Sequence, residues 1–486
     1  MQLADQSLLR SQAYVDGKWI DGESGGVFAV TNPATGGKVV DVPRLTRADV
    51  ARAIDAAARA QPAWRAKTAK ERSTILRRLY ELMMENQEDL ARIMTVEQGK
   101  PLAEARGEVA YAASFIEWFA EEGKRVYGDT IPQHREDSRL VVVKEPVGVT
   151  GAITPWNFPA AMITRKAGPA LAAGCAMIIK PASATPLSAL ALAELGERAG
   201  LPAGVMSVVT GSGSDATEIG GELTSNATVR KISFTGSTDI GKLLMEQCAG
   251  QVKKVSLELG GNAPFIVFDD ADLDAAIDGT MICKFRNAGQ TCVSANRILV
   301  HDKIFDRYTD KLASRIQALQ VGDGMDEGTA IGPLINDAAI EKVDSHVRNA
   351  QTMGAQTVVG GNPHNLGGSF YQPTLLTDVT TDMDMSNEET FGPVAGLQRF
   401  SDEKDAVRIA NDTPFGLAAY FYSRDIGRVW RVSEALEYGM VGINSGLIST
   451  EVAPFGGVKE SGIGREGSHY GIDEFVEVKY LCMSGI

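Results

Sequence analysis

Residues 147–183, VGVTGAITPWNFPAAMITRKAGPALAAGCAMIIKPAS, decide the fold class. The apolar runs Val147–Ile153 and Cys175–Lys180 have the composition of buried strands, and residues 160–173 between them have that of a helix. The alternation continues with strand-like runs at Val205–Thr210 and Lys231–Phe234 and helical stretches at 188–199 and 214–223. Short buried strands that alternate with helices are typical of a parallel sheet. The sequence therefore predicts an α/β fold with a doubly wound sheet.

The chain continues on both sides of this stretch with helix and strand patterns. Residues 47–125 carry apolar side chains at a three-to-four spacing, which predicts helices packed on the sheet. A second unit begins near Glu258, with a strand-like run at Pro264–Phe268 and an acidic helix start at Asp269–Leu273. The alternation continues to about residue 450, and we therefore expect a second α/β domain.

Two segments fit neither unit. Residues 126–144 predict a hairpin around Arg135–Ser138, and residues 475–481 alternate apolar and polar side chains. Arms that pair with another subunit would explain both segments. An ordinary edge hairpin and a docked tail explain them equally well from the residues alone.

The charge balance and the cysteines exclude several functions. With 48 basic and 62 acidic residues, the net charge of −14 repels nucleic-acid backbones and anionic lipid surfaces. Five cysteines without a CxxC motif favour neither disulfides nor a zinc cluster, and they fit a reducing cytoplasm. The N-terminus has no evident secretion signal, and the longest apolar stretch, Ala167–Ile179, is shorter than the ~20 residues of a membrane span. We expect a cytoplasmic protein that binds neither nucleic acid nor membrane.

A cysteine and a glutamate are candidate catalytic residues. Cys292 follows the polar turn Arg286–Thr291, and Glu258 lies 34 residues upstream, before Gly260 and Gly261. A thiolate attacks carbonyl carbon well, and a carboxylate can take a proton from the thiol or from water. The two residues can therefore complete a covalent cycle. The alternative is a buried cysteine and a surface glutamate.

Asn157 is a candidate oxyanion donor. It lies in Thr154–Pro159, between a strand and a helix, where a doubly wound sheet places a cofactor or a reacting group. Its carboxamide N–H and the backbone N–H of Cys292 could together hold an oxyanion, and one such donor is worth ~3 kcal/mol in a transition state. A single asparagine in a turn is more often structural.

Two motifs at strand ends indicate a dinucleotide site. Lys180–Ser183 lies where the adenosine ribose would be read, and a lysine beside a small hydroxyl tolerates a 2′-phosphate that an acidic residue would repel. Gly236–Gly241 follows a strand and opens a helix, so its N–H groups could hold a pyrophosphate. Taken alone these motifs are weak, because a lysine that ends a strand is usually a solvated charge and the glycine motif is not GxGxxG.

Arg165 and Arg286 are two cations close in sequence to Asn157 and Cys292. If they converge in one pocket, they would bind a carboxylate in bidentate fashion. The alternative is that each arginine pairs with a local acid, and the sequence does not favour either reading. The five histidines show no metal-ligand spacing and no Ser-His-Asp arrangement, so we expect no metal.

Seven motifs, TPWNFP, KPAS, FTGST, ELGG, GQTC, EETFGP and PFGG, occur in this order along nearly the whole chain. Together they resemble the aldehyde dehydrogenase superfamily. Within it, ITRK, KFRNAGQTC, GLIS and PFGGVKESGIGREGSHYGIDEF are most similar to succinate-semialdehyde and glutarate-semialdehyde dehydrogenases. Those enzymes oxidise short aldehydes that carry a distal carboxylate.

The resemblance implies a role for each matching residue. Cys292 matches the nucleophile, Glu258 the general base and Asn157 the oxyanion donor. Cofactor contacts are implied for Thr154, Trp156, Lys180, Ser183, Gly236, Ser237, Glu389 and Phe391. Substrate contacts are implied for Arg165, Arg286, Ser449, Thr450 and Phe455.

Some of these matches are more detailed. Glu389 is expected on the nicotinamide ribose and Phe391 beside the nicotinamide ring. Trp156 also matches, with Phe455, the aromatic walls of the aldehyde tunnel, and Lys166 matches a lysine near the proton exit path. Ser294 stands where some relatives carry a second cysteine, so a local disulfide switch is not expected.

The resemblance also implies the reaction. Serine at position 183 is the family variant associated with NADP, so we expect NADP as cofactor, with NAD tolerated. Succinic or glutaric semialdehyde would be oxidised through a Cys292 thioester, which water activated by Glu258 hydrolyses. One methylene is worth only about 1–3 kcal/mol, so the sequence does not separate the two substrates.

The expected domain organisation follows from the motifs and the family. Residues 1–125 and 145–256 would form a dinucleotide-binding domain, and residues 257–450 a catalytic domain. Residues 126–144 and 470–486 match the oligomerisation arms of the family, which forms homodimers or homotetramers.

Three other functions compete with this reading. The nearest is an aldehyde dehydrogenase with another aldehyde substrate. A thioesterase that uses Cys292 and Glu258 without a cofactor is a different class, which the nucleotide-binding turns disfavour. A non-catalytic role is disfavoured by the intact set of cysteine, glutamate and asparagine.

Overall fold

The computed structural model describes residues 1–486 and contains two large sheets. The first has eight strands in the order β2-β1-β9-β8-β7-β10-β11-β21, and those from β9 to β11 run parallel. The strands are β1 (Ala13–Val15), β2 (Lys18–Ile20), β7 (Val149–Ile153), β8 (Ala176–Lys180), β9 (Met206–Val208), β10 (Val229–Thr235), β11 (Lys254–Glu258) and β21 (Gly462–Ile463). The four strands predicted between residues 147 and 234 are confirmed, and so is the α/β fold class.

Helices cover both faces of this sheet, because successive side chains of a strand point to opposite sides. Met177 and Ile179 of β8 belong to the core under α2 to α6, whereas Ala176 and Ile178 belong to the core under α1, α7 and α8. The helices are α1 (Arg47–Ala66), α2 (Ala69–Glu85), α3 (Gln87–Gln98), α4 (Leu102–Glu122), α5 (Ala161–Ala173), α6 (Pro186–Ala199), α7 (Ala216–Ser225) and α8 (Thr238–Ala249). Burial on both faces explains why β8 is a continuous apolar run.

Local signals in the sequence set the helix ends. Capping boxes begin α1 at Thr46 and α2 at Thr68, where the threonine hydroxyl accepts the N–H of the residue three positions on. Helix α6 begins at Pro186, which suits the first turn because proline lacks an N–H. Left-handed glycines, Gly174 and Gly200, end α5 and α6.

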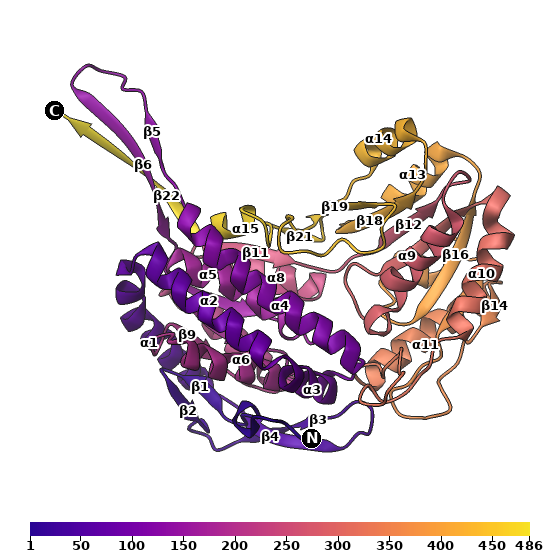
Figure 1. Ribbon diagram of the computed structural model, residues 1–486, viewed down its shortest axis with the longest axis horizontal. Helices are drawn as coiled ribbons and strands as arrows, with labels where there is room; N and C mark the ends of the chain where they lie inside the picture. The colour runs from indigo at the N-terminus through magenta and orange to yellow at the C-terminus, as the bar shows by residue number, and fades with distance from the viewer.

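The second sheet has seven strands in the order β14-β15-β16-β13-β12-β18-β19 and a core of its own (Figure 1). Its strands are β12 (Ala263–Val267), β13 (Ala295–His301), β14 (Gln356–Val359), β15 (Thr374–Thr377), β16 (Val394–Phe400), β18 (Ala418–Tyr422) and β19 (Met440–Ile443). Its helices are α9 (Leu273–Phe285), α10 (Phe305–Gln317), α11 (Asp337–Thr352), α12 (Asp384–Asn387), α13 (Glu403–Asn411) and α14 (Ile426–Ala435). The predicted second α/β unit is therefore present.

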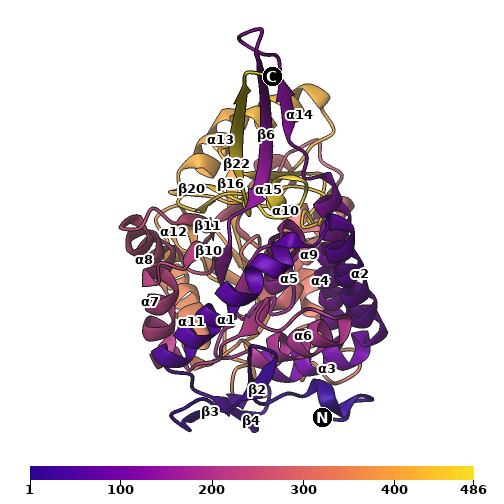
Figure 2. The ribbon, with the colours of Figure 1, turned by 90° about the vertical axis from the view of Figure 1, so that its left-hand side faces the viewer.

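A three-stranded antiparallel sheet projects from the body of the molecule (Figures 1 and 2). It consists of β5 (Asp129–Ile131), β6 (Ser138–Pro146) and β22 (Val476–Ser484). The hairpin and the alternating tail predicted from the sequence are thus strands that pair with each other. Whether they also pair with another subunit stays a prediction.

The remaining elements are short. Strands β3 (Val27–Thr31) and β4 (Lys38–Pro43) form a hairpin, β17 (Phe415–Gly416) pairs with β20 (Val458–Lys459), and α15 (Tyr470–Asp473) precedes the projecting strand β22. After the second sheet the chain returns to the first, where β21 pairs with β11 beside Glu258.

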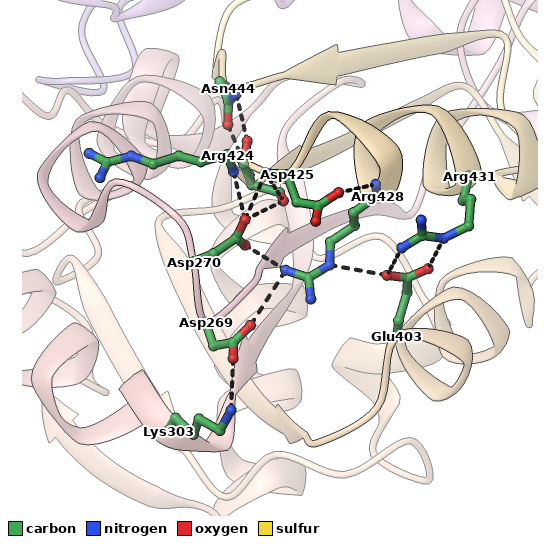
Figure 3. A network of polar contacts seen from close by, with 10 residues as sticks. Asp269, Asp270, Lys303, Glu403, Arg424, Asp425, Arg428, Arg431 and Asn444 are labelled. Carbon is green, nitrogen blue, oxygen red and sulfur yellow. Dashed lines mark hydrogen bonds and ion pairs between the residues drawn. The ribbon is translucent and has the colours of Figure 1, made fainter.

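One polar network fixes the end of the second sheet next to α14 (Figure 3). Arg428 lies 2.5 Å from Asp270, 3.4 Å from Asp269 and 3.1 Å from Glu403, which joins the end of β12 to α13 and α14. Asp270 also accepts the backbone N–H of Asp425 at 2.8 Å, just before α14 begins. This network therefore joins three segments that are distant in sequence.

None of the helices combines the length and the apolar character that crossing a membrane requires. All five cysteines are free thiols, and no group of three or more His, Cys, Asp or Glu side chains is arranged to hold a metal ion.

Candidate active site

A cavity of about 370 Å³ lies at the carboxyl ends of the first sheet and receives residues from both units. Seven of the predicted site residues line it: Trp156, Asn157, Gly236, Ser237, Cys292, Glu389 and Phe391. Trp156 and Phe391 meet edge to face with ring centres 5.6 Å apart. The structure therefore brings together side chains that are up to 235 positions apart in the sequence.

The loop before Cys292 has an unusual backbone. Asn287 and Ala288 have φ of 51° and 54°, in the left-handed region that few residues other than glycine adopt. At the next position, Gly289, a Cβ would lie 2.1 Å from the carbonyl oxygen of Gly392. This tight turn follows the end of helix α9. Cys292 comes three residues after it, is partly buried and lines the cavity.

The charges around Cys292 act in opposite directions. Burial and, to a lesser degree, the carboxylates of Glu389 and Glu258 raise the pKa of its thiol to about 12, although the cations Arg165 and Arg286 oppose this shift. The thiol is therefore protonated at neutral pH before any ligand binds. A nearby positive charge or a base that removes the proton would produce the nucleophilic thiolate.

Asn157 is buried beside Cys292 and held on two sides. Its Oδ1 accepts the N–H of Phe158 at 3.1 Å, and its Nδ2 donates to the carbonyl of Gln290 at 3.2 Å. A carboxamide has two N–H bonds, so the second remains for an oxyanion in the cavity.

Glu258 is the last residue of β11 and is buried. Burial and the negative charge of Glu466 raise its pKa well above the usual range of a glutamate, and its Oε2 has no hydrogen-bond partner. A Cβ at Gly456 would lie only 2.8 Å from Oε1, so the glycine gives the carboxylate room. A raised pKa makes the Glu258 carboxylate a stronger base once it is deprotonated.

The two arginines differ in their partners. Arg165 is buried, lies 2.7 Å from Glu466 and stacks its guanidinium 3.8 Å from the ring centre of Phe455. Arg286 makes no ion pair, and its guanidinium lies 5.2 Å from the ring centre of Phe158. The positive charges of both arginines lower the pKa of the Cys292 thiol. The sequence left open whether each arginine pairs with an acid. Arg165 does so, with Glu466, which lies 301 positions away in the sequence, and Arg286 does not.

Ser449 and Thr450 are partly buried. The Thr450 hydroxyl donates to Glu451 at 3.2 Å, and Ser449 makes no side-chain hydrogen bond. Nothing in the structure ties either residue to the arginines.

A second, smaller hollow of about 120 Å³ lies between α7 and α8. Lys180 lines it at the end of β8, and burial lowers the pKa of its ammonium to about 8. Ser183 is partly buried and Thr154 is buried, and neither lines this hollow or the larger cavity.

The model of the aldehyde dehydrogenase family matches residues 19–481. The chain belongs to the aldehyde dehydrogenase family. The resemblance noted in the sequence is therefore confirmed.

Individual relatives are similar over their whole length. A succinate-semialdehyde dehydrogenase [NADP(+)] of Escherichia coli is 64% identical, over 99% of this chain and 100% of its own length. A glutarate-semialdehyde dehydrogenase of Pseudomonas aeruginosa is 63% identical over 100% of both chains. The crystal structure of a succinate-semialdehyde dehydrogenase from Burkholderia pseudomallei has a TM-score of 0.98 at 62% identity and covers 100% of both chains.

The two hollows fit the NAD(P) cofactor that membership of this aldehyde dehydrogenase family implies. Helix α8 begins between them, and its N-cap Ser237 makes no side-chain hydrogen bond to the helix. The first N–H groups of α8 are therefore available to a phosphate, which a helix N-terminus also attracts by its dipole.

Sequence reasoning missed several residues of this site. Glu466, which binds both Arg165 and Lys166, lies in a motif that was noted only for its resemblance. Tyr111 has a buried hydroxyl without a hydrogen-bond partner. Burial raises its pKa, and the charges of Arg165 and Arg286 only partly oppose this shift. Leu243 is part of the apolar wall of the smaller hollow. Its sequence pattern is that of an ordinary apolar helix face, so this role could not be predicted.

Proposed function

We propose that this chain oxidises succinic or glutaric semialdehyde to the dicarboxylic acid, with NADP preferred and NAD tolerated. The observation that carries the proposal is that the Arg286 guanidinium has no ion-pair partner and is close enough to Cys292 to lower the pKa of its thiol. The relatives named above act on these two semialdehydes and are 64% and 63% identical.

The chemistry follows from Cys292 and Asn157, which line the cavity, and from the buried Glu258, which does not line it. Glu258 or water accepts the proton of Cys292, and the thiolate adds to the aldehyde carbon, so that a C–S bond forms and the carbonyl π bond becomes an alkoxide. The free N–H of Asn157 and the backbone N–H of Cys292 stabilise that oxyanion, each worth ~3 kcal/mol in the transition state. When NADP is bound it accepts the hydride from this carbon, and a thioester remains on Cys292.

Hydrolysis then releases the acid. Glu258, whose pKa burial raises, first releases to solvent any proton that it took from Cys292, and then takes a proton from water as the water attacks the thioester carbonyl. The C–S bond breaks, the thiolate is regenerated and the carboxylic acid leaves. Because a base is available to activate water, transfer of the acyl group to another thiol is not needed.

The cofactor residues have distinct tasks in this proposal. Gly236 and Ser237 hold the pyrophosphate at the start of α8, Glu389 holds the nicotinamide ribose, and Trp156 and Phe391 form an aromatic wall. Lys180 and Ser183 meet the 2′-phosphate, which the buried ammonium of Lys180 attracts while it is charged. Thr154 supports the turn before Trp156. The Escherichia coli relative is a succinate-semialdehyde dehydrogenase [NADP(+)], which supports this preference.

The substrate residues bind the other end of the aldehyde. Arg286 forms the main hydrogen bonds to the distal carboxylate, and Arg165 adds its Nε, a buried atom that has no hydrogen-bond partner. In this proposal Ser449 and Thr450 contribute their hydroxyls to the same subsite. Phe455 covers the guanidinium of Arg165.

We further propose the domain limits and the assembly. Residues 1–125 and 145–256 form the dinucleotide-binding domain, residues 257–450 the catalytic domain, and residues 126–144 and 470–486 the oligomerisation arms of a homodimer or homotetramer. Val478, Tyr480, Leu481 and Met483 support this assembly, because they are large apolar side chains on a projecting strand and are 40% to 68% exposed. Sedimentation of the purified protein as a monomer would contradict it.

One absorbance experiment tests the function. Purified protein is mixed with NADP or NAD and succinic semialdehyde, glutaric semialdehyde or butanal, an uncharged aldehyde of similar length, and the absorbance of the reduced cofactor is followed. Rapid reduction of NADP with the acidic aldehydes only is expected. Equal rates with butanal would keep the chemistry and contradict the carboxylate site, and no reduction with any aldehyde would contradict the function.

A further inference from the structure

The segment between α3 and α4 reaches from the first unit into the catalytic loops. Gly99, with φ of 95°, ends α3, and the second unit packs closely on its backbone. A Cβ at Gly332 would lie 2.2 Å from the carbonyl oxygen of Gly99, and one at Gly324 would lie 2.4 Å from that of Lys100. Only glycine allows this approach, so the backbone around Lys100 is fixed between the two units.

Lys100 is a buried lysine that contacts the Asn157 turn directly. Its ammonium donates to the carbonyl oxygen of Asn157 at 2.8 Å, lies 4.1 Å from the ring centre of Phe158 and is paired with Glu108, which is also buried. The other oxygen of Glu108 accepts the N–H of Ala160 at 3.0 Å. One ion pair therefore holds both ends of the turn from Asn157 to the start of α5.

The same segment also holds the loop of Cys292. Gln98 accepts the N–H of Lys100 at 3.0 Å and donates to Oδ1 of Asn287 at 3.1 Å. Nδ2 of Asn287 in turn donates to the carbonyl of Asn157 at 3.0 Å. The carbonyl of Asn157 thus accepts two hydrogen bonds, one from the ammonium of Lys100 and one from the left-handed turn before Cys292.

A buried ion pair is an expensive way to stabilise a fold. Removing two charges from water costs several kcal/mol each, and apolar residues of similar volume are often as stable. Apolar side chains could not make hydrogen bonds to the peptide group of Asn157. The ion pair makes them, and it thereby fixes the direction of the Asn157 carboxamide.

We propose that Lys100, held by Glu108, is a positioning residue for the oxyanion donor Asn157. The ammonium does not touch the substrate. It fixes the main chain of Asn157, so that the free N–H of the carboxamide points to the alkoxide that forms on the aldehyde carbon. This inference rests on the proposed function, in which Asn157 stabilises that alkoxide.

The test compares two reactions of Cys292, of which only one makes an oxyanion. The first is the burst of NADPH in the first turnover with succinic semialdehyde. The second is alkylation by iodoacetamide, a displacement at saturated carbon, followed on the Cys292 peptide by mass spectrometry. In Lys100→Met the burst rate should fall about tenfold to a hundredfold, since a whole oxyanion donor is worth about 10²–10³. The alkylation rate should stay within about threefold of the wild type.

The outcomes separate the inference from the proposed function. An unchanged burst in Lys100→Met overturns the inference, and so does an equal loss of both rates, which would mean that Lys100 only holds the Cys292 loop. A wild-type protein without any burst overturns the proposed function and the inference with it.

Two further variants complete the experiment. Lys231→Met is the matched control, because Lys231 is also buried and paired with a glutamate, Glu474, but lies near the start of β10, away from the cavity. It should leave both rates unchanged. If Lys100→Met does not fold, the double variant Lys100→Met with Glu108→Gln removes both buried charges and carries the same expectation.

Discussion

Replacing Arg286 by methionine should remove the preference for acidic aldehydes without damaging the enzyme. Methionine keeps most of the length of the aliphatic stem and removes the guanidinium that lies 5.2 Å from the ring centre of Phe158. Arg286 has no ion-pair partner, but its charge lowers the pKa of the partly buried Glu104, so its loss should cost only a small part of the folding stability. If the proposed function holds, the variant also loses the hydrogen bonds of Arg286 to the substrate carboxylate.

The magnitude follows from the strength of charged hydrogen bonds. Each is worth about 1.5–3 kcal/mol, and 1.4 kcal/mol is a factor of ten, so kcat/KM for succinic semialdehyde should fall about tenfold to a hundredfold. For butanal the fall should be smaller, because only the favourable effect of the Arg286 charge on the Cys292 thiolate is lost. The ratio of the two kcat/KM values is the quantity to measure, because it cancels any general loss of active enzyme.

Arg165→Met is the informative comparison. Arg165 lies 2.7 Å from Glu466, so its loss leaves that buried carboxylate with Lys166 as its remaining cation. The charge of Glu466 already raises the pKa of Glu258, and the variant removes a cation that opposes this effect. We therefore expect Arg165→Met to slow both aldehydes. Equal losses for both aldehydes in Arg286→Met, or no loss for the acidic one, would refute the assignment of Arg286.

Four other predictions follow from the structure. Glu258→Gln should keep the first burst of NADPH, measured by stopped-flow absorbance, but lower steady-state turnover by about 10²–10⁴-fold. Full steady-state turnover would exclude Glu258 as the base. Lys180, with a pKa of about 8, is charged below that pH and neutral above it, so fluorescence titrations should show NADPH binding weakening by up to tenfold per pH unit above pH 8, while NADH binding stays nearly flat. Without cofactor, the rate of Cys292 alkylation should rise about tenfold per pH unit from pH 7 to 10, since its pKa is about 12, and a plateau below pH 8 would contradict the buried, protonated thiol. Arg428→Met should lower the thermal unfolding temperature by a few degrees, because it breaks a partly buried network worth about 1–3 kcal/mol, whereas Arg408→Met, which breaks an exposed pair, should not change it.

The sequence predicted the elements of the fold better than their associations. The strands at Val149–Ile153 and Ala176–Lys180 were visible because burial on both faces requires continuous apolar runs. The hairpin at 126–144 and the tail were visible as segments without a place in either sheet. Their pairing with each other was not predicted, because alternation sets the face of a strand and not its neighbour.

The candidate residues of the site could be predicted because their chemistry depends on residue type. A cysteine after a tight glycine-containing turn, a glutamate before two glycines and an asparagine after a strand each suggested a role, and the ordered motifs indicated the family. The structure adds that Asn157 and Cys292 line one cavity. The sequence could not show this, because the two residues come from different units.

What the sequence by itself determined about this protein is its class of fold, its family and the side chains able to do the chemistry. Only the tertiary structure decided which charges meet. It pairs Arg165 with Glu466 and leaves Arg286 without an acid, and it places Lys100 against the carbonyl of Asn157. The physical reason is that the energy of a charge depends on its burial and on the partners within a few ångströms, which sequence spacing does not fix.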